Sequence, residues 1–267
     1  MKAQSRSEIA ALLDRHQVKP SHRLGQHFLA DANITRKIVD LARIEPGDHV
    51  VEIGAGTGTL TLALAAAGAE VVAYELDQAL RPILEEVTAG LDVELRFFDV
   101  TTVDLGLVLD DGPWKMVANL PYNVGTPVLL DALRKAPQIG HFVVMVQREV
   151  ADRLVAEPGG KAYGLPSVVT GIHSRRRLVF RVPPQVFFPQ PSVESAVVVL
   201  DRVPPPPGAE RAIELAAAGF GQRRKMLRRS LTEVFDDPAV ALKQAGIDPT
   251  ARAEQLSADD YVRLAHV

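Results

Sequence analysis

A glycine-rich turn and a distant acidic residue form the first pattern that could do chemistry. The turn, Gly54-Ala-Gly56-Thr-Gly58, follows the apolar run 49–53, and Glu75 stands 21 residues after Gly54, near the end of the next such run. Glycines let the backbone approach a ligand closely, and a carboxylate at the end of a second strand can accept hydrogen bonds from a ribose diol. The pattern indicates a ligand that contains a nucleoside.

The spacing of the glycines separates two classes of such ligand. The dinucleotide fingerprint requires glycine at the sixth position of the turn, where this chain has Thr59, and no pattern typical of hydride transfer accompanies it. An acidic residue such as Glu52 before a G-x-G-x-G turn is typical of class I S-adenosylmethionine (SAM) methyltransferases. We therefore expect SAM rather than NAD. Taken alone, the turn leaves other nucleotide binders and a purely structural role open.

Two further strand ends add to this site. Asp99 follows the third apolar run and Asn119 ends the fourth. Ligands of open α/β sheets bind beyond the carboxyl ends of the strands, so these residues are expected to lie near the glycine turn. Asp99 can accept a hydrogen bond from an adenine amino group, and Leu76 and Val100 can sandwich the ring.

The segment Asn119-Leu120-Pro121-Tyr122 is the pattern best suited to a reaction. An exocyclic adenine amine is a poor nucleophile because its lone pair is delocalised, so attack on a sulfonium methyl group requires a more tetrahedral nitrogen. The Asn119 side-chain oxygen and the Pro121 carbonyl could accept its two hydrogens, and Tyr122 offers a face for stacking. Such a transfer needs alignment and no metal. A proline-terminated strand with a core tyrosine is the alternative interpretation.

The elements that position these residues alternate regularly. Short β-branched runs, each followed by a helical pattern, occupy residues 49–53, 69–76, 93–98, 114–120 and 141–147. This alternation predicts an α/β fold whose parallel sheet is covered by helices on both faces. Two more β-rich runs within residues 175–202 are expected to pair antiparallel at the sheet edge.

Residues 204–207 are four consecutive prolines followed by Gly208, and this is the clearest linker in the chain. Downstream, apolar spacings of three and four residues predict four short helices, at 210–220, 225–235, 239–246 and 257–267. We therefore expect a basic N-terminal arm (1–24), a cofactor-binding domain (25–203) and a helical domain (208–267).

Composition limits the class of protein. The 267 residues are 47% hydrophobic and 24% charged and contain no cysteine, which is typical of a globular chain and excludes disulfides and thiolate chemistry. No run approaches the roughly 20 apolar residues of a membrane span, so a cytoplasmic location is expected. The net charge of −3 conceals basic clusters at residues 175–181 and 223–229. They indicate an anionic partner such as nucleic acid, with a solvated helix face as the alternative.

The chain resembles the ribosomal RNA adenine N6,N6-dimethyltransferases, and among them the bacterial small-subunit (16S) type, over nearly its whole length. Besides the glycine turn and residues 119–122, the motifs that carry the resemblance occupy residues 25–29, 147–150, 161–164, 187–195 and 222–225. The resemblance implies a Rossmann-like class I SAM-dependent methyltransferase domain with a mostly parallel seven-stranded sheet, followed by a small all-helical RNA-binding domain.

The resemblance also implies the residues of a SAM site, namely Gln26, His27, Leu29, Gly54, Gly56, Glu75, Leu76, Asp99, Val100 and Asn119. In it, His27 and Leu29 bracket the methionine end, Glu75 holds the ribose and Asp99 the adenine. Asn119 lies between the cofactor and the target adenine. Phe187 stacks on the flipped adenine opposite Tyr122.

The substrate that the resemblance implies is a hairpin near the 3′ end of small-subunit rRNA. Two adjacent adenosines there each receive two methyl groups during late subunit assembly, after the base has left its stack. Phosphate contacts are expected from basic residues of the arm and of both clusters, namely Lys19, Arg23, Arg175, Arg176, Arg223, Arg224, Lys225 and Arg228. We expect a monomer that binds the small ribosomal subunit.

Two positions depart from the usual bacterial form, His27 in place of Asn and Ala55 in place of Pro. Neutral histidine can also donate or accept one hydrogen bond, so SAM binding should survive, with added pH sensitivity below about 6.5. Two alternatives stay open. A 23S rRNA adenine methyltransferase of the macrolide-resistance type usually has Ile where Leu120 stands. A non-catalytic nucleic-acid-binding relative would not need intact acceptor and cofactor positions.

Overall fold

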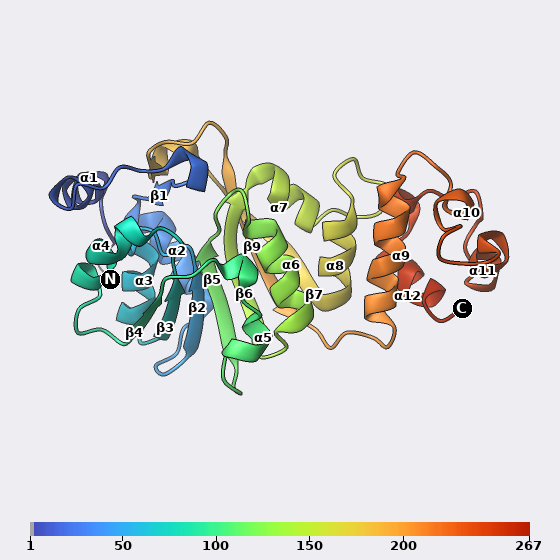
Figure 1. Cartoon of the computed structure of the whole chain (residues 1–267), viewed down its shortest axis with the longest axis horizontal. Coiled ribbons are helices and arrows are strands. Elements are labelled where there is room, and N and C mark those ends of the chain that lie inside the picture. The colour runs from blue at the N-terminus through green and yellow to red at the C-terminus, as the bar shows by residue number, and fades with distance from the viewer. Residues whose placement is uncertain (1–2) are drawn as a thin grey trace. The chain divides into compact units, whose positions relative to one another are not determined.

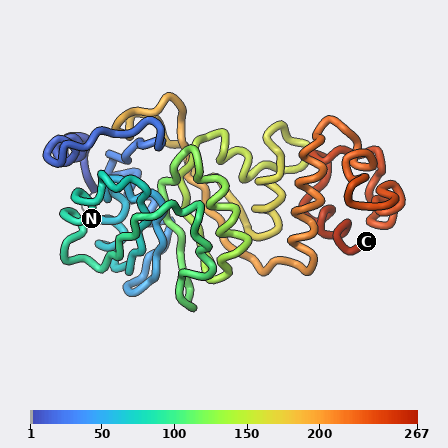
Figure 2. The backbone as a smooth tube through the Cα atoms, viewed as in Figure 1, coloured from blue at the N-terminus to red at the C-terminus, as the bar shows by residue number. Residues whose placement is uncertain are grey.

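The computed structural model describes residues 3–267, and they form two compact units. The first unit runs up to Ala151 and includes residues 177–202, whereas the second contains residues 152–176 and 203–267. Figures 1 and 2 trace this path. The helical unit therefore includes a segment, 152–176, that falls within the range 25–203 expected for the cofactor-binding domain.

A seven-stranded sheet forms the centre of the first unit, in the order β4-β3-β2-β5-β6-β9-β7. Its strands are β2 (His49–Ile53), β3 (Glu70–Tyr74), β4 (Val93–Arg96), β5 (Trp114–Asn119), β6 (Ile139–Gln147), β7 (Ser174–Val182) and β9 (Ser195–Arg202). The five strands from β4 to β6 are parallel, and β9 runs antiparallel to β6. The predicted α/β fold, with its last two strands as neighbours at one edge, is confirmed.

Helices cover both faces of this sheet because both sets of alternating strand residues are apolar and buried. One set, which includes Val50, Val71, Val117 and Val143, shares a core cluster with residues of α2 (Ala32–Ala42), α3 (Thr59–Ala66) and α4 (Arg81–Val87). The opposite set is equally buried, and α6 (Gly125–Lys135) packs against β6. The short helices α5 (Leu105–Val108) and η3 (Val100–Thr102) contact α6.

The N-terminal residues begin with a helix that packs on the first unit. In α1 (Arg6–Arg15), Ile9 and Leu13 are buried in the core cluster. After η1 (His22–Leu24), the two-residue strand β1 (Phe28–Leu29) pairs antiparallel with β8 (Phe187–Phe188), which follows η4 (Pro184–Val186). Figure 2 shows the blue N-terminal segment beside the gold segment that contains β8. Much of the expected RNA-binding arm is thus part of the folded unit.

The second unit is helical. Its helices are α8 (Leu165–His173), α9 (Ala209–Gly221), α10 (Leu227–Ser230), α11 (Pro238–Gln244) and α12 (Ala258–Leu264), with the 3₁₀ turn η5 (Ala253–Gln255) and, at its start, the end of α7 (Arg148–Leu154). The four helices predicted after the linker are present. Helix α10 is shorter than expected: it begins after Met226, which forms a β-bridge with Arg252, and it ends at Ser230. No helix within residues 3–267 is long and apolar enough to cross a membrane.

Candidate active site

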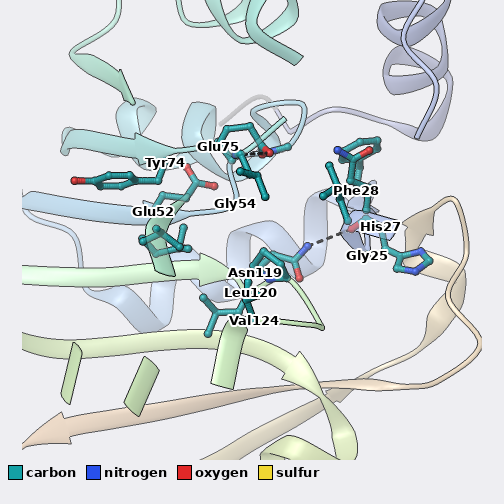
Figure 3. Close-up of a pocket in the computed structure, with 18 of the residues that line it drawn as sticks. Gly25, His27, Phe28, Glu52, Gly54, Tyr74, Glu75, Asn119, Leu120 and Val124 are labelled. Carbon is teal, nitrogen blue, oxygen red and sulfur yellow. Dashed lines mark hydrogen bonds between the residues drawn. The ribbon is translucent and has the colours of Figure 1, made fainter. Parts of the chain in front are cut away.

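The predicted cofactor residues meet at the point where the strand order of the sheet reverses. Successive strands lie on one side of β2 as far as β4 and then continue on the other side from β5, so the carboxyl ends of β2 and β5 flank a crevice. A cavity of about 280 Å³ lies there (Figure 3). It is lined by all of the predicted cofactor residues, namely Gln26, His27, Leu29, Gly54, Gly56, Glu75, Leu76, Asp99, Val100 and Asn119.

The glycine turn has the shape that only glycine tolerates. Gly54 and Gly56 have φ values of +80° and +59°. A Cβ atom on Gly56 would lie 2.9 Å from the Phe28 ring, and one on Gly54 would lie 3.1 Å from the Pro121 ring. Side chains at these positions would therefore strain the backbone and collide with the cavity walls.

Glu75 closes the turn from the neighbouring strand. Its Oε2 accepts a hydrogen bond from the Gly56 N–H at 2.8 Å, and its Oε1 accepts from the Leu76 and Asp77 N–H groups, both at 2.9 Å. Burial raises the pKa of Glu75 although these bonds favour the carboxylate. Both oxygens are held in place, and Oε2, which accepts only one of these bonds, keeps a lone pair that could accept from a ribose hydroxyl.

Glu52 is a second buried acid in the wall of the cavity. It is 1% exposed, and the Thr61 hydroxyl donates a hydrogen bond to its Oε2 at 2.6 Å. Burial raises the pKa of Glu52 to about 8, and the charge of Glu75 acts in the same direction. Two buried acids in the wall favour a cationic ligand, because a nearby positive charge compensates for the hydration that the carboxylates lose on burial. SAM, with its sulfonium and ammonium groups, fits this requirement.

Asn119 presents an acceptor that the protein leaves without a partner. Its Nδ2 donates a hydrogen bond to the His27 carbonyl at 3.2 Å, which fixes the orientation of the amide (Figure 3). Its Oδ1 is buried and has no hydrogen-bond partner among residues 3–267. Leaving a buried acceptor unpaired costs roughly 1–3 kcal/mol. The site therefore favours a ligand that brings an N–H group to this oxygen.

Pro121 and Tyr122 follow directly. The Pro121 carbonyl accepts a hydrogen bond from the Gly125 N–H at 2.8 Å and keeps a second lone pair. The Tyr122 hydroxyl is 2.6 Å from Ser195 Oγ, and its ring lies 5.5 Å from the His27 ring. His27 Nδ1 lies 2.8 Å from the Pro189 carbonyl and must donate to it, because a carbonyl only accepts. Tyr122 is thus held at both its hydroxyl and its ring.

A second cavity of about 390 Å³ adjoins the first. The two share Gly25, His27, Tyr122 and Asn123. Apart from the buried Pro191, the remaining wall is polar or exposed and comprises His22, Arg23, Gln147, Ser192 and Val193. Tyr122 therefore borders both a nucleoside-sized cofactor cavity and a neighbouring space with a cationic residue at its wall.

Three predicted site residues make contacts within the protein that the sequence did not suggest. Phe187 is fully buried because the β1–β8 register sets it opposite Leu29, and it lines neither cavity, so in this conformation it cannot stack on a base. The Gln26 side chain is bonded to the Ser21 N–H and to Asp77, both at 2.7 Å. Asp99 Oδ1 accepts from the Thr101 hydroxyl and N–H, which lowers the pKa of Asp99.

The predicted RNA-binding residues divide into two groups. Most are exposed, namely Lys19, Arg23, Arg175, Arg224, Lys225 and Arg228. Arg176 is the clearest exception, since its side chain is 12% exposed and donates to the Ala156 carbonyl and the Thr170 hydroxyl, both at 2.9 Å. Arg223 is partly used as well, because its Nε donates to Glu254 at 2.6 Å. Arg176 therefore stabilises the helical unit instead of presenting its charge to a partner.

Phe98 is a residue of the cavity wall that sequence reasoning missed. Its side chain is 64% exposed. It immediately precedes Asp99, so an aromatic residue at the carboxyl end of the third strand was the available sequence pattern. Its face offers stacking area beside Leu76 and Val100.

The sheet with its antiparallel strand β9, the glycine turn and the paired buried acids at the strand ends define a class I SAM-dependent methyltransferase. The sequence profile of the family described as "Ribosomal RNA adenine dimethylase" matches residues 17–267, and the chain belongs to this family.

Individual relatives agree with this assignment. The chain is 45% identical to the ribosomal RNA small subunit methyltransferase A of Leifsonia xyli subsp. xyli, over 97% of this chain and 96% of the relative. Among solved structures it is similar to a dimethyladenosine transferase from Plasmodium falciparum (TM-score 0.74, 22% identity, 89% and 96% of the two chains). It is also similar to the 23S rRNA methyltransferase ErmE (TM-score 0.69, 27% identity, 90% and 98%).

Proposed function

We propose that this protein transfers methyl groups from SAM to the N6 amines of two adjacent adenosines in the 3′-terminal hairpin of 16S rRNA during small-subunit biogenesis. The observation that carries the proposal is the unpartnered Oδ1 of Asn119, buried in the cofactor cavity beside Tyr122. An adenine amine supplies the N–H group that this oxygen lacks.

The residues of the chain activate the amine by accepting its hydrogens. Bound SAM supplies an activated methyl group on a sulfonium. Asn119 Oδ1 accepts one N–H of the amine and the Pro121 carbonyl accepts the other with its free lone pair, so the nitrogen lone pair is less delocalised. It would attack the methyl carbon as the bond from that carbon to sulfur breaks, and the methylated, cationic nitrogen would then lose one proton to water. Tyr122, fixed by Ser195 and His27, supports the flipped base through its ring face. After the first transfer only one N–H remains, so the second transfer requires only one acceptor.

The second cavity is the proposed entrance for the target nucleotide. It shares Tyr122 with the cofactor cavity, and Arg23 in its wall can contact a phosphate. Further phosphate contacts are proposed for the other exposed cations, namely Lys19, Arg175, Arg224, Lys225 and Arg228. We propose that the protein acts as a monomer on the small subunit in the cytoplasm.

A large-subunit substrate is the second candidate, since the similar ErmE is named for 23S rRNA. Two features favour the small subunit: Leu120 stands where that type usually has Ile, and the 45% identical relative is named for the small-subunit RNA. A non-catalytic relative is disfavoured because the residues proposed as acceptors and as cofactor ligands all line one cavity.

The test is incubation of the purified protein with SAM and either small or large subunits from a strain that lacks these methylations, followed by mass spectrometry of the RNA. Dimethyladenosine in small subunits alone is the expected result. Modification of large subunits alone would favour the 23S candidate, and dimethyladenosine in neither would overturn the proposal. The Asn119→Ala variant serves as the catalytic control.

A further inference from the structure

The N-terminal segment contacts the glycine turn from outside the cavity, through Gln4. This side chain is 6% exposed. Its Nε2 donates to the Thr57 carbonyl at 2.7 Å, and its Oε1 accepts from the hydroxyls of Thr57 at 2.7 Å and Thr59 at 2.9 Å. Thr57 and Thr59 line the cofactor cavity, whereas Gln4 does not. Gln4 therefore touches the cavity wall without reaching a ligand.

Local structure fixes Gln4 in this place. Ser5 begins α1 with a capping box, in which its Oγ accepts from the Glu8 N–H and Glu8 Oε2 accepts from the Ser5 N–H. The next residue, Arg6, donates to the carbonyls of Gln185 at 2.8 Å and Phe187 at 2.9 Å. The chain on either side of Ser5 is thus attached to the glycine turn through Gln4 and to η4 and β8 through Arg6.

The glycine turn needs such support. Thr57 stands between Gly56 and Gly58, which both have positive φ, at +59° and +86°. Glycines are the residues that lose most conformational freedom when they become ordered, so an unsupported turn would become ordered only on ligand binding and weaken it. Gln4 restricts the turn before the ligand arrives, through two hydrogen bonds to Thr57 and a third to Thr59, the first residue of α3.

We propose that Gln4 is a positioning residue for the cofactor: its hydrogen bonds to Thr57 and Thr59 hold the 54–58 turn in the conformation that binds SAM. The N-terminal segment then serves the cofactor cavity as well as any RNA contact of Lys19 and Arg23. The proposal concerns SAM binding, so it does not rest on the identity of the RNA substrate.

Calorimetry of SAM binding to the full-length protein without RNA tests this with two variants. Gln4→Met keeps the length of the side chain and removes all three hydrogen bonds, so SAM affinity should fall ~10-fold. Gln4→Glu still accepts from both hydroxyls but cannot donate to the Thr57 carbonyl, so its affinity should lie between those of wild type and Gln4→Met. Turnover at saturating SAM should stay within about twofold of wild type in both, since bound SAM restores the turn.

The matched control is Gln244→Met, because Gln244 is an exposed glutamine of α11 in the other unit. A role in packing alone would leave Gln4→Met with the affinity of wild type, and that result overturns the proposal. If Gln4→Met fails to fold by circular dichroism, Thr59→Ser and Thr59→Val replace it. The serine variant should keep SAM affinity and the valine variant should lose ~threefold or more, and equal affinities would overturn the proposal. Because no RNA is present, neither outcome bears on the proposed RNA substrate.

Discussion

Charged and polar side chains have fixed positions in the cofactor cavity, whereas the basic side chains of the helical unit differ in their surroundings from one residue to the next. In the cavity, Glu52 and Glu75 are buried and fixed by Thr61 and by three backbone N–H groups, while one acceptor, Asn119 Oδ1, is left for a ligand. In the helical unit, Arg176 is used internally and Arg224 is exposed, although both come from runs of basic residues.

The difference shows what each kind of pattern determines. The positions of residues at the carboxyl ends of parallel strands are fixed by the topology, because the sheet brings these ends together. The orientation of a basic side chain in such a run is not fixed by the topology, because a long side chain can turn toward the carbonyls of its own unit or toward solvent. We therefore expect substitutions at the strand ends to change the rate of methyl transfer, and substitutions of exposed basic residues to change RNA affinity.

The largest expected effect is on turnover. Asn119→Ala removes the unpartnered acceptor, so single-turnover methylation should slow by on the order of 10²-fold or more, by analogy with loss of one oxyanion-hole donor. RNA affinity should not change, because Asn119 makes no part of the basic surface. A rate within about threefold of wild type would mean that activation of adenine does not require two acceptors.

The stability of the folded protein is expected to depend on pH through Glu52. In the folded protein without ligand its pKa is raised to about 8 from 4.5 by burial. Between these values the unfolded chain is ionised and the folded one protonated, so stability should fall as pH rises from about 5 to 8, by a few kcal/mol. Glu52→Gln should flatten this dependence. Thermal unfolding of both proteins across this pH range checks it, and parallel curves would contradict it.

Glu75→Ala should weaken SAM binding by roughly 1–3 kcal/mol, because charge-assisted hydrogen bonds to the ribose are lost. The variant also loses the hydrogen bond that the Gly56 N–H donates to Glu75 in the wild-type protein. Glu70→Ala is a suitable control, since Glu70 is an exposed acid at the start of β3, the strand that Glu75 directly follows. Calorimetry would separate the two, and an unchanged dissociation constant for Glu75→Ala would exclude it from the ribose site.

The smallest effect is expected from the basic residues, and it distinguishes two neighbours. Arg224→Glu should weaken binding of small subunits and lower the salt slope by about 1, since one released counterion is lost per phosphate contact. Arg223→Glu should change the slope less, because Arg223 is bonded to Glu254 and to the Lys161 carbonyl. Equal slopes in the two variants would show that the internal bonds of Arg223 do not limit its contact with RNA.

The sequence allowed the sheet, its edge strands and the grouping of ten expected cofactor residues around one cavity to be predicted, because strand ends and glycine spacing follow from the topology, whereas Phe98 in the same wall was missed. It did not allow the burial of Phe187 to be predicted, since that depends on the register between β1 and β8, two strands of two residues each. The grouping of residues 152–176 with the C-terminal helices was also missed, because periodicity identifies helices and not their packing partners. Gln4 lay in a segment whose composition indicated only a basic arm.

The most direct test of the separation between the two regions measures two quantities on the same variants. Single-turnover methylation at saturating SAM and small subunits, together with the subunit dissociation constant, is determined for Asn119→Ala and Arg224→Glu. The account predicts that Asn119→Ala loses on the order of 10²-fold in rate with unchanged affinity, while Arg224→Glu loses affinity and keeps its rate at saturation. If Asn119→Ala kept its rate, or if Arg224→Glu lost rate at saturation with affinity intact, the chemistry would not lie where the cavity places it.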